Sequence, residues 1–106
     1  MVINELINTN KEAFYNLCEE HQVKYLFAFG SSVTDNFDYD KSDIDLLVEI
    51  DEPDPLERGE KIISLWDKLE TFFKRKVDLL SNPIIRNRFL RQSVDESKVL
   101  IYGTSE

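Results

Sequence analysis

Two aspartates at an i, i+2 spacing, Asp43 and Asp45, open a strongly apolar run that ends at Ile50. In an extended strand residues i and i+2 point to the same face, so the two carboxylates are predicted to lie side by side while Ile44 points into a core. Like charges this close repel each other and oppose folding. A divalent cation between them would relieve the repulsion, because hard cations take carboxylate oxygens as ligands.

A second chemical feature is the turn Gly30-Ser31-Ser32, which ends an apolar run from Val23 to Phe29. Glycine permits close approach of the backbone to a ligand, and the amides of Ser31 and Ser32 can donate hydrogen bonds to phosphate oxygens, as can the Ser31 hydroxyl. A helical turn after the glycine would favour an anion further. The sequence therefore predicts a phosphate-binding turn here.

Asp78 adds a third carboxylate. It lies within a short predicted strand, residues 76–80, whose neighbour in the sheet would carry Asp43 and Asp45. Three carboxylates on adjacent strands would form a site for one or two Mg²⁺ ions, which also take water and phosphate oxygens as ligands. Two such ions stabilise the attacking and the leaving oxygen of an in-line displacement. Asp43, Asp45 and Asp78 are thus the predicted metal ligands and catalytic residues.

The apolar pattern predicts the elements that position these groups. A helical stretch over residues 3–21 is predicted to break at Asn8-Thr9-Asn10, with Thr9 or Asn10 capping the second helix. Asp54 and Pro55 predict a helix start, since Asp is favoured at the N-cap and Pro in the first turn. The other predicted elements are strands at 23–29, 43–50, 76–80 and 99–102, a helical turn with a loop at 33–42, and helices at 55–74 and 83–95.

This order of elements predicts an α/β (α+β) fold, a small mixed β-sheet with helices packed on it. Strands 43–50 and 76–80 are joined through a helix, which favours a parallel pair with a right-handed crossover. The connection between strands 23–29 and 43–50 is short enough for an antiparallel pair.

The composition limits the function classes. With 106 residues, of which 42% are hydrophobic, the chain is predicted to form a single domain over residues 1–106. Its net charge of −8 disfavours direct nucleic-acid binding, but it leaves a metal-bound triphosphate open because the metal reverses the local charge. The single cysteine, Cys18, cannot form an internal disulfide, so we expect a cytoplasmic protein. No signal peptide and no apolar run of transmembrane length is visible, so no membrane contact is expected.

The turn at Gly30-Ser31, the polar loop after it and the run from Ser42 to Val48 together resemble the signature of DNA polymerase β-like nucleotidyltransferases. The chain is most similar to the minimal nucleotidyltransferase (MNT) domains of that superfamily, which occur as antitoxins beside HEPN-domain toxins. The similarity covers most of the chain, from the first helix to the Leu-Ile-Tyr near its end. The combined motif is more specific than a Gly-Ser pair or an Asp-x-Asp pair alone.

The resemblance implies a role for each matching residue. It assigns nucleotide binding to Gly30, Ser31 and Ser32. It assigns Mg²⁺ binding to Asp43 and Asp45, and it makes Asp78 the third carboxylate, which shares a metal and accepts the proton of the attacking hydroxyl. The implied reaction transfers AMP from ATP to a tyrosine hydroxyl of a HEPN-domain toxin.

Two departures from the family pattern keep other functions open. Many members carry arginines just after the Gly-Ser pair, where this chain has Ser32-Val33-Thr34-Asp35. The loop from Ser31 to Asp43 is also longer than usual, which a surface loop tolerates. A non-catalytic antitoxin that neutralises its partner by binding is therefore a second hypothesis, and transfer to a small molecule is a third. Homo-oligomerisation also stays open.

The acidic residues have two rival interpretations. Asp43 and Asp45 could form the solvated face of an edge strand. Asp38 and Asp40, with Glu49 at the twelfth position, also mimic an EF-hand calcium loop, but its sixth position is Asp43 where glycine is required. Neither rival accounts for the Gly-Ser turn upstream.

The remaining candidates favour structural roles. His21 at a helix end is predicted to interact with the helix dipole, and Cys18 is predicted to lie in the core. Arg88 and Arg91 share one face of the last predicted helix, with Arg86 off it. They form either a solvated face or a contact to nucleotide phosphate or an acidic partner.

Overall fold

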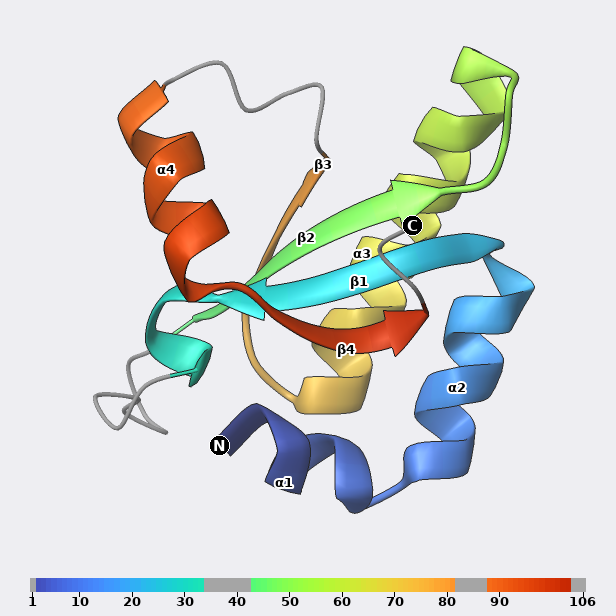
Figure 1. Cartoon of the computed structure of the whole chain (residues 1–106). Coiled ribbons are helices and arrows are strands. Elements are labelled where there is room, and N and C mark those ends of the chain that lie inside the picture. Colours follow the sequence, from blue (N-terminus) through green and yellow to red (C-terminus); the bar gives the residue numbers. More distant parts are fainter. Residues whose placement is uncertain (1, 34–42, 82–87, 104–106) are drawn as a thin grey trace.

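The computed structural model of the chain describes residues 2–33, 43–81 and 88–103. The strands form one sheet in the order β3-β2-β1-β4 (Figure 1). β1 pairs antiparallel with β2 and β4, whereas β2 pairs parallel with β3, which confirms the predicted mixed sheet and α+β class. The described elements are α1 (Val2–Asn8), α2 (Lys11–Glu20), β1 (Val23–Phe29), the 3-10 turn η1 (Gly30–Val33), β2 (Ile44–Ile50), α3 (Pro55–Phe73), β3 (Val77–Ser81), α4 (Arg88–Ser97) and β4 (Val99–Gly103).

The helix starts follow from their capping residues. The side chain of Asn10 accepts a hydrogen bond from the Ala13 amide at 3.3 Å, so the predicted break is confirmed and Asn10, not Thr9, caps α2. At the start of α3, Asp54 Oδ1 accepts from the Leu56 amide at 3.0 Å, as the Asp-Pro pair predicted.

The boundaries of two predicted segments differ in the structure. The predicted helix at 83–95 is observed as α4, which ends later, at Ser97; the Lys98 amide still donates to the Val94 carbonyl at 2.8 Å, and this bond extends the last turn. The start of that predicted helix lies outside the described residues. The helical turn expected within 33–42 begins earlier, at Gly30, directly after β1, and residues 34–42 lie outside the described part.

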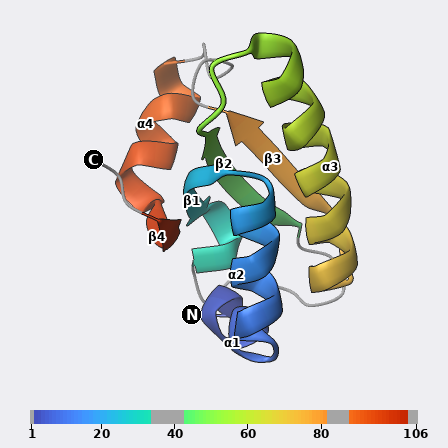
Figure 2. The same ribbon diagram turned by 90° about the vertical axis from the view of Figure 1, so that its right-hand side faces the viewer.

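The sheet has two faces with different covers (Figure 2). Helices α1, α2 and α3 cover one face and enclose the larger core, to which β2 contributes Ile44, Leu46, Val48 and Ile50. Helix α4 lies over the other face, where Val94 packs with aromatic side chains of β1 and with Leu47. Side chains alternate along a strand, so Asp45 and Asp78 both belong to the face that α4 covers.

Expectations for single residues are also confirmed. His21 caps α2, and its Nδ1 donates to the Leu17 carbonyl at 2.8 Å. Cys18 is fully buried, and burial, with a smaller contribution from Glu19, raises the pKa of its thiol to about 12. Among the helices of residues 2–33, 43–81 and 88–103, none has the length and apolar character to cross a membrane.

Candidate functional site

Strand register brings two of the predicted catalytic carboxylates together. In the parallel pair of β2 and β3, Asp45 lies directly opposite Asp78. Asp43 lies two residues before Asp45, just ahead of β2. All three therefore lie at the edge of the sheet where β2 and β3 begin, with Asp78 exposed and the other two half-buried.

Burial and two neighbouring carboxylates contribute to the pKa of Asp45. Its pKa is raised from 3.8 to about 6, first because partial burial disfavours the charged form, then because of the charges of Asp78 and Asp43. The strand register places the Asp45 and Asp78 carboxylates side by side, with Asp43 two residues before Asp45. A bound cation at this edge would favour the ionised form of Asp45 and relieve the repulsion.

The Gly30 turn lies against the same carboxylate. Gly30 has φ of +65°, in the left-handed region, and a Cβ built there would lie 2.6 Å from Oδ2 of Asp45. Any other residue would be strained by its backbone and would also collide with the Asp45 side chain. The antiparallel pairing of β1 with β2 explains the contact, because Phe29 pairs with Asp45 and the turn follows Phe29 directly.

The two serines of the turn differ in what they can offer a phosphate. Ser32 is buried, and its hydroxyl donates to the Phe29 carbonyl at 2.6 Å, so that hydroxyl stabilises the turn itself. Of the groups of Ser32 that could donate to a phosphate, only the backbone amide is therefore left. The backbone of Ser31 belongs to η1, while its side chain lies outside the described part of the structure.

Sequence reasoning missed a contribution from α4. The Gly30 amide points to the hydroxyl of Ser97 at 3.5 Å, and that hydroxyl donates to the Ser93 carbonyl at 2.8 Å. The last turn of α4 is thus tied to the predicted phosphate-binding turn. Sixty-seven residues separate Gly30 from Ser97, and a lone serine at a helix end gives no local signal of such a contact.

The donor set at this edge fits Mg²⁺. Within residues 2–33, 43–81 and 88–103, no group of three or more acidic, histidine or cysteine side chains lies close enough together to hold a metal ion. Mg²⁺ does not require such a group, since it usually takes one or two carboxylates and completes its shell with water and phosphate oxygens. Asp45 and Asp78, on neighbouring strands, can supply those two carboxylates, with Asp43 beside them.

The structure tests the rival interpretations of the acidic residues and places two of the arginines. Glu49 lies inside β2, between two paired strands, so the segment is not the loop and exiting helix of an EF-hand. β2 is a central strand of the sheet, which also excludes the edge-strand alternative for Asp45. Arg88 is exposed and Arg91 half-buried on α4, and their contact to a phosphate or partner stays a prediction. Arg86 and the pair Asp38 and Asp40 lie outside the described residues.

Comparison with known proteins places this geometry in context. A family model described as a nucleotidyltransferase domain matches residues 11–101. A Methanocaldococcus jannaschii protein, named as a candidate protein adenylyltransferase, is 34% identical over 100 residues, which are 93% of this chain and 94% of the relative.

Two solved structures are similar to the fold. The structure of a candidate minimal nucleotidyltransferase matches with a TM-score of 0.65 and 26% identity, over 92% of this chain and 94% of the other. A chain in the complex of tri-AMPylated Shewanella oneidensis HEPN toxin with an MNT antitoxin matches with a TM-score of 0.54 and 22% identity, over 92% of this chain and 72% of the other. The latter likeness shows a shared fold.

Proposed function

This chain belongs to the nucleotidyltransferase domain family and is a nucleotidyltransferase, and on that premise we propose that it transfers AMP from ATP to a hydroxyl of a HEPN-domain toxin. The acceptor is a tyrosine hydroxyl, and the modification makes the chain an antitoxin. The M. jannaschii relative named as a candidate protein adenylyltransferase and the AMPylated HEPN toxin beside an MNT antitoxin support this choice. The single cysteine, buried in the core, suits a reducing cytoplasm.

One observation carries the proposal: Asp45 faces Asp78 across the β2–β3 pair and touches the Gly30 turn from the same side. A triphosphate held by the amides of the turn would therefore lie beside the carboxylates. Asp45 and Asp78, with Asp43 beside them, would hold Mg²⁺, which when bound neutralises phosphate charge and polarises the phosphorus that is attacked.

Two carboxylates of the chain have separate roles in the transfer reaction. The acceptor oxygen attacks the α-phosphorus of ATP, the bond from that phosphorus to the oxygen bridging to the β-phosphate breaks, and pyrophosphate leaves. Asp78 is exposed, so it can reach an acceptor that arrives from solvent and take the proton of its hydroxyl. Asp45 is half-buried and lies against the Gly30 turn, so it serves to position phosphate and metal.

A non-catalytic antitoxin is the second candidate, and the turn itself favours it. The Gly30 amide is directed at Ser97 and the Ser32 hydroxyl at Phe29, so fewer donors of the turn face a phosphate. Neutralisation would then come from binding alone.

Incubation of the chain with labelled ATP, Mg²⁺ and the product of the neighbouring gene separates the candidates. Catalysis predicts label on the partner that is lost in Asp45→Asn while the complex still forms. Neutralisation that survives Asp43→Asn and Asp45→Asn together would establish inhibition by binding. Label on an isolated small acceptor, without a protein partner, would instead identify a small-molecule transferase. A neighbouring gene that encodes no HEPN-like helical protein would count against the antitoxin role.

A further inference from the structure

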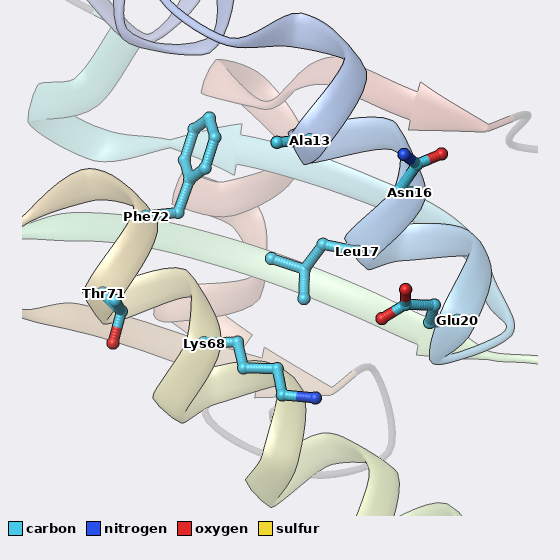
Figure 3. A pocket seen from close by; sticks show the side chains of 7 residues that line it. All are labelled: Ala13, Asn16, Leu17, Glu20, Lys68, Thr71 and Phe72. Atoms are coloured by element: carbon cyan, nitrogen blue, oxygen red, sulfur yellow. The ribbon is translucent and has the colours of Figure 1, made fainter.

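A groove runs along the seam between α2 and α3, on the face of the sheet opposite the carboxylates (Figure 3). It consists of two hollows of about 470 Å³ and 460 Å³ that share Glu20. We propose that this groove, here called the α2–α3 groove, is the docking site for a basic amphipathic helix of the partner protein. The proposed function supplies the identity of that partner, the HEPN-domain toxin.

One end of the groove is apolar and rigid. Ala13, Leu17 and Phe72 supply its apolar lining, and Figure 3 shows the side chains of Leu17 and Phe72 directed into the gap between the helices. The polar side chains of Asn16, Lys68 and Thr71 also line this end. The Phe72 ring packs on Phe14 and Phe73, with centroid distances of 5.7 and 5.1 Å, so its position is fixed from the core. A preformed apolar floor binds a partner side chain at little cost in ordering.

The other end is acidic. Glu20, Glu57 and Glu60 line it together with Lys61. The Lys61 ammonium already donates to Glu52 at 2.5 Å and to Gln22, so its charge is compensated locally. Lys68 lines the other hollow, and Glu20, Glu57 and Glu60 together still leave the groove with an excess of acidic side chains.

The floor of this acidic end is fixed across the seam. His21 Nε2 lies 2.9 Å from the Ser64 hydroxyl, which joins the end of α2 to the middle of α3. The Nδ1 of His21 donates to a carbonyl, so in the neutral ring Nε2 accepts from Ser64. The two walls of the groove are therefore held at a set separation.

These dimensions and charges select the occupant. From Glu57 to Phe72 the groove follows fifteen helical steps, about 22 Å at 1.5 Å per residue, the length of a four-turn helix. Such a helix would insert apolar side chains near Phe72 and carry Lys or Arg about twelve positions away, opposite Glu60. A second copy of this chain is the poorer occupant, because each copy has a net charge of −8.

Docking on this face leaves the catalytic edge uncovered. The groove lies on the side of the sheet covered by α1 to α3, whereas Asp45 and Asp78 belong to the side of α4. The inference therefore separates the surface that holds the toxin from the surface that modifies it.

The test measures binding of the product of the neighbouring gene, which is expected to be the HEPN-domain toxin, by calorimetry at low and at high salt. Glu20→Lys combined with Glu60→Lys is expected to weaken binding about tenfold or more at low salt and to flatten its salt dependence. Asn16→Arg, an exposed position at the apolar end, is expected to weaken binding as well. AMP transfer to the toxin should then show a raised KM for toxin with kcat retained.

The matched control carries the same change in net charge elsewhere. Glu5→Lys combined with Asp67→Lys alters exposed residues outside the groove and is expected to bind as the wild type does. Equal weakening by both pairs, or no weakening by the groove pair, overturns the docking site. A self-association of the isolated chain that the groove pair abolishes would assign the groove to a second copy and likewise overturn it.

The outcomes also separate this inference from the proposed function. A complex that responds to the groove pair but carries no label on the toxin leaves the docking site standing and refutes AMP transfer. Label on the toxin, together with an affinity that the groove pair leaves unchanged, supports AMP transfer and refutes the docking site. Absence of any complex between the wild-type chain and the toxin contradicts both.

Discussion

Replacement of Asp45 by asparagine is predicted to stabilise the metal-free protein while it abolishes activity. The fold raises the pKa of Asp45 from 3.8 to about 6, chiefly by burial and then by Asp78 and Asp43. A carboxyl whose folded pKa lies above its unfolded value stabilises the fold below the unfolded pKa, and this contribution is lost as pH rises through about 6. At pH 7.5 the charged Asp45 therefore lowers the stability of the metal-free fold. Asp45→Asn removes this cost with little change in the shape of the side chain.

The magnitude follows from the shift and the exposure. A rise from 3.8 to about 6 would be equivalent to about 3 kcal/mol for a fully buried group. Asp45 is half-buried, and solvent screening reduces this to about 1 kcal/mol. For a domain of this size, that gain raises Tm by roughly 4–8 °C.

Thermal unfolding followed by circular dichroism in EDTA measures the difference. At pH 7.5 Asp45→Asn should melt above the wild type, and near pH 4 the gap should close because both side chains are then neutral. Mg²⁺ with ATP should raise the Tm of the wild type more than that of the variant. Glu49→Gln is the control, since it removes a carboxylate from the same strand and face, at the end far from Asp78. A variant that melts at or below the wild type at pH 7.5, or a gap that widens on acidification, refutes the reasoning.

Three further variants test other parts of the site. Gly30→Ala places a Cβ 2.6 Å from Asp45 Oδ2 at φ of +65°. Urea unfolding should show a loss of stability of about 1–2 kcal/mol from backbone strain alone, and calorimetry should show that ATP binding is abolished. Ser97→Ala removes the acceptor of the Gly30 amide, worth about 1 kcal/mol, so the KM for ATP should rise about fivefold with kcat retained and Ser97→Thr should restore it; an unchanged KM contradicts this role. Asp78→Asn should lower AMP transfer about 100-fold or more while toxin binding, measured in parallel, stays intact; wild-type rates would exclude Asp78 as the base.

Local chemistry made much of the fold predictable. The alternation from Ile44 to Ile50 fixed which side chains enter the core, and the helix between β2 and β3 implied their parallel pairing. These two features together bring Asp45 to Asp78. The sequence predicts Asp54 as a cap and leaves Asn10 and Thr9 as two candidates for another, and both Asp54 and Asn10 act as caps in the structure.

Contacts between segments that lack a periodic apolar pattern could not be predicted from the sequence. Ser97 meets Gly30 only because α4 crosses the second face of the sheet, and Val94 is the buried anchor that holds it there. The inward turn of the Ser32 hydroxyl depends on the geometry of η1, since a serine after glycine is equally suited to donate outward. The α2–α3 groove depends on how two helices pack, which their separate apolar patterns do not specify.

The antiparallel register between β1 and β2 does most to assemble the site. Phe29, the last residue of β1, pairs with Asp45, so the turn that begins at Gly30 must fall beside this carboxylate. A slip of one residue would exchange the faces of β2, bury Asp45 among the helices and turn Ile44 outward. The large core under β2 forbids that slip, because it would expose the buried side chains of that strand. The hydrophobic core on one face thus fixes where the Gly30 turn lies relative to the carboxylates on the other face, and the remaining cost at the site is the burial of Asp45 together with the repulsion from Asp78 and Asp43.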